Sequence, residues 1–288
     1  MTTSIVFGGA GFLGSHLVDA LTRRGEAVIV IDDLTVGRLG NLERAISSGR
    51  VTFVYVDIPI DGELLRTIVR SCDHERVDFI YYFVPAANHD PAADARTAAV
   101  IDVAIEQHAR LIVSSTVDAG RDDPAGTLAA DAVAGAVRGR GLDARVVRVS
   151  VCYGPRAQDG DPVIGALLEA AVARRPMPIE GSGHQVRPIT YVADAIDRLI
   201  AVARRAESTF GPIDIVGSDE RSPLEIARAL ARTAGMKLDV AYLPGDDAPR
   251  RGHEPRKNSG LGAWRGTSLE AGLRSTYVWF AKETRLFV

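Results

Sequence analysis

A glycine-rich motif between a short apolar run and an amphipathic segment constrains this chain more than any other feature of its sequence. Ser4–Phe7 has the apolar character of a buried strand, and the segment after the glycines has helical periodicity. Within the motif Gly8–Gly14, Gly8 permits a tight turn and Gly14 permits close packing of a helix against the strand. Gly11 lets a pyrophosphate approach the backbone, where a helix N-terminus offers free N–H groups. The motif predicts a dinucleotide-binding turn, with a plain tight turn as the alternative.

An acidic residue stands at the end of the next predicted strand. Ala27–Ile31 is apolar and β-branched, and Asp32 follows it, 18 residues after Gly14. A carboxylate at this distance from the glycines accepts both hydroxyls of an adenosine ribose and repels a 2′-phosphate. The two features together therefore favour NAD over NADP as the cofactor.

Apolar strands alternate with helical segments through the first half of the chain. Further strands are predicted at residues 52–56, 79–84, 111–114 and 145–149, and helices at 62–71, 92–109 and 127–139. Such alternation is typical of βαβ units with right-handed crossovers. The predicted fold class is α/β, with a Rossmann-type doubly wound parallel sheet and a smaller C-terminal α/β lobe that binds the substrate.

Glycine, proline and polar residues become more frequent after Pro155, where helix start signals replace the regular alternation. Asp161-Pro162 combines an N-cap with proline at the first helical position and predicts a helix to about Arg175. Ser222–Glu225 has the pattern of a capping box. Asp194 is expected to cap a further helix, and a strand is predicted at residues 212–216.

Length and charge limit the possible organisation and partners. The 288 residues suffice for about two domains. We expect an NAD-binding Rossmann domain over residues 1–155, with its sheet completed by about 190–216, and a mainly substrate-binding lobe over 156–288. A net charge of −3 without long runs of one sign argues against nucleic acid or a membrane as the main partner. Neither a secretory signal nor a membrane span is visible, and Cys72 and Cys152 form no disulfide framework or metal cage, so a cytoplasmic protein without a metal site is expected.

Several longer motifs share the pattern of one family of enzymes. Besides the glycine motif and Asp32-Asp33-Leu34, they are Ser114-Ser115-Thr116, Tyr153-Gly154-Pro155-Arg156, the segment 181–194 and Pro244-Gly245-Asp246. Together they resemble the extended short-chain dehydrogenase/reductase family, which includes nucleotide-sugar epimerases, dehydratases and decarboxylases. The resemblance covers nearly the whole chain. It implies NAD as cofactor, a nucleotide-sugar as small-molecule substrate, transient hydride transfer, and a homodimer.

The residue pair that moves the proton in this family is absent. The resemblance implies a Tyr-x-x-x-Lys pair on the helix after the fifth strand, in which the lysine lowers the pKa of the tyrosine. The best alignment places Thr127 and Asp131 at these positions, and no tyrosine in the chain has a lysine four residues later. Of the 34 basic residues, the only lysines are Lys237, Lys257 and Lys282. The standard mechanism is therefore not available to this chain.

Three residues remain as catalytic candidates. Thr116 keeps the hydroxyl that, by the resemblance, hydrogen-bonds the reacting oxygen of the substrate. His89 follows the fourth predicted strand, and its near-neutral pKa suits it to proton transfer, with an ordinary loop histidine as the alternative. Asp131 places a negative charge where the family has a positive one, which favours the cationic nicotinamide.

The binding candidates divide into a cofactor set and a substrate set. The predicted NAD contacts are Gly8, Gly11, Phe12, Leu13, Gly14, Asp32, Asp33, Leu34, Asp57, Ile58, Val84, Ala86 and Ser114. The predicted substrate contacts are Tyr153, Gln185, Arg187 and Arg250. Arg187 suits an anionic diphosphate because a guanidinium is always charged and binds oxyanions with two parallel hydrogen bonds; a surface ion pair is the alternative. For Tyr153 the alternative is packing, and for Arg250 a solvated basic loop.

The sequence leaves three functions open. The first is an NAD-dependent enzyme that acts on a nucleotide-linked sugar with a non-standard proton acceptor. The second is a catalytically inactive NAD-binding partner or regulatory protein of the same fold. The third is a redox enzyme whose substrate is not nucleotide-linked, because Val151 and Leu243 stand where the family often has asparagine and arginine.

Overall fold

The computed structural model describes most of the chain, in two compact units. The described residues are 1–56, 62–72, 76–84, 91–117, 124–157, 161–206, 212–217, 219–245 and 266–286; side chains are left undescribed at 91–94, 116, 117, 124–131 and 284–286. The first unit comprises Met1–Val117, Asp122–Val149 and Ile196–Ile215, and the second comprises Ser150–Ala195 and Val216–Val288. The chain therefore leaves the first unit, enters the second, and returns to the first before it finishes in the second.

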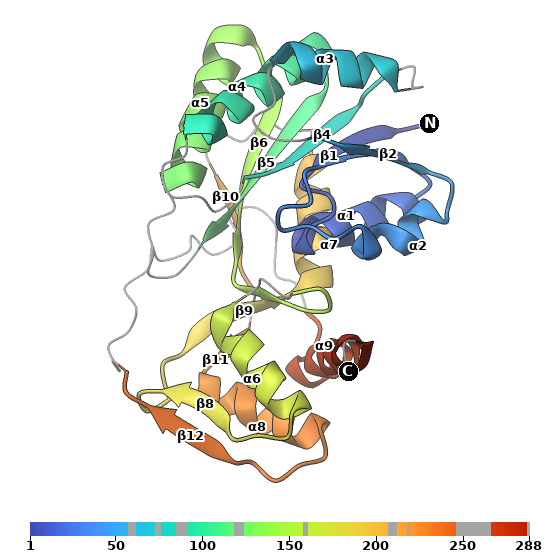
Figure 1. The fold of residues 1–288 in the computed structure, drawn as a ribbon. Coiled ribbons are helices and arrows are strands. Elements are labelled where there is room, and N and C mark those ends of the chain that lie inside the picture. Colours follow the sequence, from blue (N-terminus) through green and yellow to red (C-terminus); the bar gives the residue numbers. More distant parts are fainter. Residues whose placement is uncertain are drawn as a thin grey trace. The chain divides into compact units, whose positions relative to one another are not determined.

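A seven-stranded sheet forms the centre of the first unit, in the order β10-β6-β5-β4-β1-β2-β3 (Figure 1). Its strands are β1 (Thr3–Phe7), β2 (Ala27–Asp32), β3 (Val51–Tyr55), β4 (Phe79–Phe83), β5 (Arg110–Val117), β6 (Ala144–Ser150) and β10 (Ile213–Ile215). The pairings of β1 with β2 and β4, of β2 with β3, of β4 with β5 and of β6 with β10 are parallel. The strand order reverses at β1, as in a doubly wound sheet, so the predicted Rossmann-type α/β fold is confirmed.

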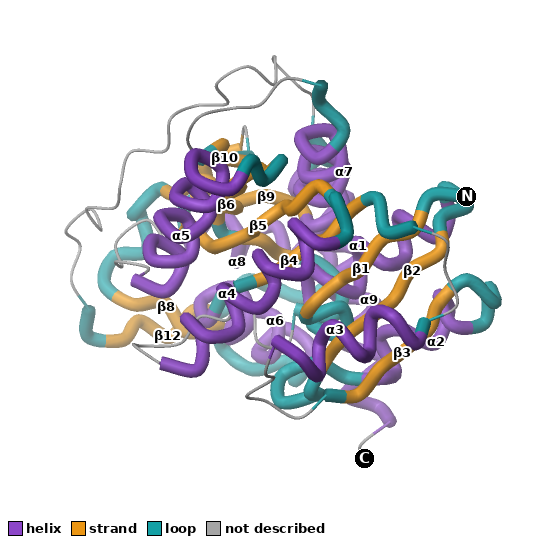
Figure 2. The backbone as a smooth tube through the Cα atoms, turned by 90° about the horizontal axis from the view of Figure 1, so that it is seen from above, coloured by secondary structure: helices purple, strands orange, loops and turns teal. Residues whose placement is uncertain are grey.

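Helices cover both faces of this sheet (Figures 1 and 2). One face carries α3 (Gly62–Ser71), α4 (Pro91–Glu106) and α5 (Pro124–Arg140), and the other carries α1 (Phe12–Arg23), the short α2 (Glu43–Ile46) and α7 (Val192–Ala203). A short 3-10 helix (Leu39–Leu42) precedes α2. The strands read as continuous apolar runs because both of their faces are buried. None of the helices that the structure describes is long and apolar enough to cross a bilayer.

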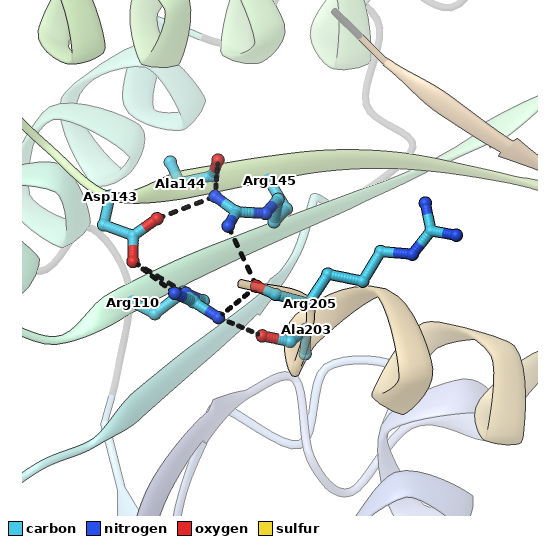
Figure 3. Close-up of polar contacts among 6 residues, drawn as sticks. All are labelled: Arg110, Asp143, Ala144, Arg145, Ala203 and Arg205. Carbon is cyan, nitrogen blue, oxygen red and sulfur yellow. Dashed lines mark hydrogen bonds and ion pairs between the residues drawn. The ribbon is translucent and has the colours of Figure 1, made fainter. Parts of the chain in front are cut away.

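The C-terminal end of α7 is fastened to the amino ends of β5 and β6 by two arginines (Figure 3). Arg110 donates from Nη1 to the carbonyl oxygens of Ala203 and Arg205, at 2.9 and 2.7 Å, and Arg145 donates to Arg205 at 3.2 Å. Asp143 pairs with both arginines at 2.7 Å. The last carbonyls of a helix lack intrahelical partners and carry partial negative charge, so the guanidinium groups satisfy them. This cluster lets the Arg145 side chain be fully buried (0% exposed).

The second unit packs helices against two small sheets. Its elements are β7 (Cys152–Tyr153), α6 (Pro162–Val172), β8 (Met177–Glu180), β9 (Arg187–Tyr191), β11 (Asp219–Arg221), α8 (Pro223–Thr233), β12 (Val240–Leu243) and α9 (Leu269–Leu286). β9 lies between β11 and β7, and β12 pairs with β8. Apolar side chains of α6, α8 and α9 form the core with residues of β8 and β9.

Two of the three helix starts expected after Pro155 are confirmed, and one is wrong. Asp161 caps α6 by accepting from the Ile164 N–H at 2.9 Å, and Ser222 with Glu225 forms the capping box of α8. α7 begins at Val192, so Asp194 lies in its first turn and is not its cap. Its carboxylate accepts instead from Thr267, which precedes α9.

Candidate functional site

The glycine turn at the carboxyl end of β1 has the geometry that its sequence requires. Gly8 has a φ of +73°, which favours glycine. A Cβ on Gly14 would lie 2.0 Å from the Gly8 carbonyl oxygen, so any larger residue would separate α1 from the strand. At Gly11, the same oxygen, at 3.3 Å, is the only described atom within 4 Å of an added Cβ. The backbone at the start of α1 is therefore open to a ligand on this side.

Asp32 is tied to this turn by backbone hydrogen bonds. Its two carboxylate oxygens accept from the Ala10 N–H and the Leu34 N–H, each at 2.8 Å. Burial raises the pKa of Asp32 above its ordinary value, and these two hydrogen bonds offset only part of that effect. Leu34 adopts a left-handed φ of +56°, which is uncommon for a branched residue and turns the chain back toward the glycines.

Three further residues complete this corner. The Asn41 amide donates to the Ala10 carbonyl oxygen at 2.8 Å, and the Arg38 N–H donates to the same oxygen at 3.1 Å. A Cβ on Gly37 would lie 2.8 Å from an Asp32 oxygen and from the Ala10 Cβ. Only the glycine at position 37 gave a sequence signal for this packing, because glycine inside a loop marks a close approach.

The ends of β4 and β5 meet beside the same turn. The Val84 N–H donates to the Ser114 carbonyl oxygen at 2.9 Å, and a Cβ on Gly8 would lie 3.6 Å from the Phe83 Cβ. Ser114 is buried, and Val84 is half-buried. The structure thus brings together, at one edge of the first unit's sheet, those predicted NAD contacts that lie within the described residues.

Other predicted site residues fall outside the structural description. Thr116 lies on β5 and Asp131 on α5, but their side chains are not described. His89, Asp57, Ile58, Ala86 and Arg250 lie outside the described residues. The catalytic roles therefore stay predictions.

Tyr153 is enclosed in the second unit. Its side chain is 3% exposed, and its ring lies 5.6 Å from that of Tyr191. A Cβ on Gly272 of α9 would lie 2.4 Å from the Tyr153 hydroxyl oxygen. Burial raises the pKa of Tyr153, and neighbouring acids such as Asp219 raise it further. The hydroxyl is therefore protonated near neutral pH and is suited to packing or hydrogen-bond donation.

Tyr153 lines a cavity to which, among the described residues, Arg187 does not contribute. Tyr153 lines a cavity of about 250 Å³, together with residues of β9, β11 and the segment that begins α9. Arg187 and Gln185 are not among its described lining residues. No group of histidine, cysteine, aspartate and glutamate side chains suited to a metal ion occurs within the described part of the chain.

Arg187, at the start of β9, is paired inside the second unit. Its Nη1 donates to one Asp161 oxygen at 2.7 Å, and its Nη2 donates to the other. The pair is largely enclosed, with side-chain exposures of 18% for Arg187 and 8% for Asp161. An ion pair is therefore observed, but it is mostly buried, whereas contact of Arg187 with a diphosphate stays a prediction.

Comparisons with known proteins decide the family. The model of the NAD dependent epimerase/dehydratase family matches residues 4–121 and 125–216. The chain belongs to this family. Membership confirms the resemblance drawn from the sequence, and the NAD of the family's name is the cofactor that the glycine motif and Asp32 predicted.

Relatives and solved structures agree with this assignment. UDP-glucuronic acid decarboxylase 1 of Arabidopsis thaliana is 28% identical over 86% of this chain, but the match spans only 62% of that protein. UDP-glucose 4-epimerase of Mycolicibacterium smegmatis is 28% identical over 98% of this chain and 99% of its own.

Two solved structures share the fold across nearly the whole chain. UDP-glucose 4-epimerase of Thermotoga maritima, solved with UDP-glucose, has a TM-score of 0.81 at 23% identity, covering 98% of this chain and 100% of its own. dTDP-glucose 4,6-dehydratase of Bacillus anthracis, solved with NAD, has a TM-score of 0.82 at 24% identity, covering 99% and 98%.

Proposed function

We propose that this chain is an NAD-dependent enzyme that acts on a nucleotide-linked sugar, with a proton acceptor other than the family's tyrosine. The observation that carries the proposal is the corner where Asp32 is tied to the glycine turn by the Ala10 and Leu34 N–H groups. The names of the relatives, which include decarboxylases and epimerases of UDP-sugars, support the substrate class.

The residues of the first unit fit the cofactor. Gly8 and Gly14 hold the turn, Gly11 leaves the backbone open, and Asp32 offers a fixed carboxylate to ribose hydroxyls. Phe12, Leu13, Asp33, Leu34, Val84 and Ser114 are the further proposed contacts, with Asp57, Ile58 and Ala86. When bound, NAD supplies a hydride acceptor and donor for the carbinol carbon of a sugar.

The proton needs a different route from the family's own. We assign Thr116 to hold the reacting oxygen of the substrate and His89 to accept its proton, with Asp131 as a negative charge that favours a cationic nicotinamide. Tyr153 is not the acceptor in this proposal, because burial raises the pKa of its hydroxyl and disfavours loss of the proton. Arg187, Gln185 and Arg250 are the proposed contacts of the nucleotide and its diphosphate. A cytoplasmic homodimer that packs through α4 and α5 completes the proposal.

The test is a panel of nucleotide-sugars incubated with the NAD-loaded protein. UDP-glucose, UDP-glucuronic acid and dTDP-glucose are the first members, with product analysis and absorbance of reduced cofactor as readouts. We expect multiple turnovers on at least one member, abolished by Thr116→Ala and strongly reduced by His89→Gln. Conversion of none of them, with no reduction of bound NAD, would contradict the proposal.

A second candidate is an NAD-binding protein without catalytic activity. The absence of a Tyr-x-x-x-Lys pair anywhere in the chain favours it. It predicts NAD retention without turnover, and a Thr116→Ala variant that behaves like the wild type. The same panel therefore separates the two candidates.

A further inference from the structure

The proposed function assigns the positive charge of Arg187 to the substrate's diphosphate, but in the structure Asp161 is paired with that charge. Both terminal nitrogens of the guanidinium donate to Asp161, one to each carboxylate oxygen. This fork-to-fork arrangement is the one by which an arginine also binds a phosphate. Asp161 thus stands where an anionic ligand of Arg187 would stand.

Asp161 is held in place from a second side. Its Oδ1 also accepts from the Ile164 N–H at 2.9 Å, so the same carboxylate caps α6. Pro162 follows it at the first helical position and fixes the backbone there. A side chain that caps a helix cannot swing away freely, so its negative charge remains beside Arg187 when a ligand arrives.

The remaining nitrogen of Arg187 offers no alternative route in this arrangement. Its Nε is enclosed and has no hydrogen-bond partner among the described residues. A ligand is therefore left with the terminal nitrogens, each of which already donates one hydrogen to Asp161 and has its second N–H beside that carboxylate. An oxyanion that reaches Arg187 must displace Asp161 or bind next to its charge.

We propose that Asp161 is a specificity-determining residue, whose carboxylate competes with the substrate's diphosphate for Arg187. The inference rests on the proposed function, because it takes Arg187 as the diphosphate contact. Competition lowers the affinity for any ligand whose main attraction is its negative charge, such as a free nucleoside diphosphate. The terminal phosphate of a free nucleoside diphosphate also carries more negative charge than the esterified diphosphate of a nucleotide-sugar, so the Asp161 carboxylate disfavours the bare nucleotide more strongly.

Asp161→Asn separates the charge of this residue from its capping role. Asparagine caps helices as well as aspartate does, so α6 keeps its start while Arg187 loses its anionic partner. We expect the NAD-loaded variant to bind UDP, dTDP or GDP about three- to tenfold more tightly than the wild type in isothermal titration, with a steeper salt dependence. Asp161→Ser, which also retains a capping oxygen without charge, serves if the asparagine variant folds poorly.

Glu169→Gln is the matched control. Glu169 is exposed on α6, so the variant removes one negative charge from the same helix without touching Arg187. It should bind each nucleotide as the wild type does. Arg187→Met should weaken binding, and Asp161→Asn should have no further effect in the Arg187→Met background, because the two residues act on the ligand as a pair.

The outcomes separate this inference from the proposed function. If the wild type binds a nucleotide and Asp161→Asn leaves that affinity unchanged or lowers it, the competition is overturned. The nucleotide-sugar assignment then still stands. Wild-type binding that Arg187→Met does not weaken also overturns the competition. Binding that appears only in Asp161→Asn supports the competition even if the panel of sugars is not converted. Absence of binding in both proteins overturns the inference, and absence of conversion as well overturns the proposed function.

Discussion

The two edges of the first unit's sheet each hold a carboxylate, and the two are held in opposite ways. At the carboxyl edge, Asp32 accepts from backbone N–H groups and enters none of the ion pairs among the described residues. At the amino edge, Asp143 pairs with Arg110 and Arg145 (Figure 3). Burial raises the pKa of Asp32; at Asp143 burial acts in the same direction, but the two arginines outweigh it and lower the pKa.

The difference separates a binding edge from a structural one. The charge of Asp143 is compensated by the two arginines, so this carboxylate contributes to stability and is not available to a ligand. Asp32 meets only the dipoles of N–H groups, and its oxygens can still accept hydroxyl hydrogens. A carboxylate kept without a cation in a buried corner is unfavourable for stability alone and is typical of functional sites.

The largest loss of stability is expected at Gly14, where α1 packs against the glycine turn. Gly14→Ala places a Cβ 2.0 Å from the Gly8 carbonyl oxygen, so α1 must move away from β1. We expect the free energy of unfolding to fall by about 3 kcal/mol and NAD retention to be lost. Urea denaturation and cofactor analysis of the purified protein measure both. Gly135→Ala, at an open position in α5, is the control and should be stabilising by up to about 1 kcal/mol. Normal NAD retention in Gly14→Ala would contradict the packing argument.

The next effect belongs to the structural edge. Arg145→Met removes the buried guanidinium that joins Asp143 to the end of α7 and should lower the free energy of unfolding by about 2 kcal/mol. The affinity for NAD should not change, because the cluster lies at the opposite edge from Asp32. Exposed Arg138, on α5, provides the control Arg138→Met, expected within about 0.5 kcal/mol of the wild type. A loss of NAD affinity in Arg145→Met would remove the distinction between the edges.

Asp32→Asn should show the reverse pattern. The new amide can accept from only one of the Ala10 and Leu34 N–H groups, so one donor is left unsatisfied, at about 1 kcal/mol. We expect the affinity for NAD to fall about tenfold or more, with a smaller loss for NADP, since the repulsion of the 2′-phosphate is also removed. Asp197→Asn, on exposed α7 surface and outside the proposed cofactor contacts, is the matched control and should bind NAD as the wild type does. Equal NAD binding by Asp32→Asn and the wild type would show that the carboxylate does not contact the ribose.

The smallest effect is a difference in the sign of the pH dependence. The pKa of Asp32 is raised above 3.8 in the folded state, so the folded state holds the proton more strongly than the unfolded state does. This contribution to stability is present below pH 3.8 and is lost as pH rises through the folded-state pKa. The pKa of Asp143 lies below 3.8, so its contribution is present above that value and is lost as pH falls through its folded pKa. Urea midpoints of the wild type, Asp32→Asn and Asp143→Asn between about pH 3 and pH 7 should separate the two slopes. Slopes of the same sign would contradict the comparison.

The sequence predicted the first unit better than the second, for a physical reason. Each strand of the first unit is an apolar run next to a helix with its own periodicity, so the signal is local. In the second unit, β12 is short and partly exposed and pairs with β8, more than fifty residues earlier in the chain. Neither strand was predicted, and α9 was missed because Thr276 interrupts its buried apolar stripe.

In the candidate site, too, local features could be predicted from the sequence and long-range contacts could not. The glycine turn and Asp32 were visible because their spacing has a direct mechanical meaning. The bonds of Asn41 to Ala10 and of Asp161 to Arg187 join residues 31 and 26 positions apart, without any motif that links them. Such partners are decided by how loops fold back on the sheet, which no local pattern contains.

The arginine cluster at the amino edge also has a consequence for the order in which the chain can fold during synthesis. Arg145 is made well before Arg205, whose carbonyl oxygen is one of its partners, and β10 is made later still. Most of the residues between the two arginines, Ser150–Ala195, belong to the second unit. A nascent chain that has just completed β6 thus carries an arginine that must be buried but lacks one of its acceptors. The ribosome must therefore deliver much of the second unit before the first can close.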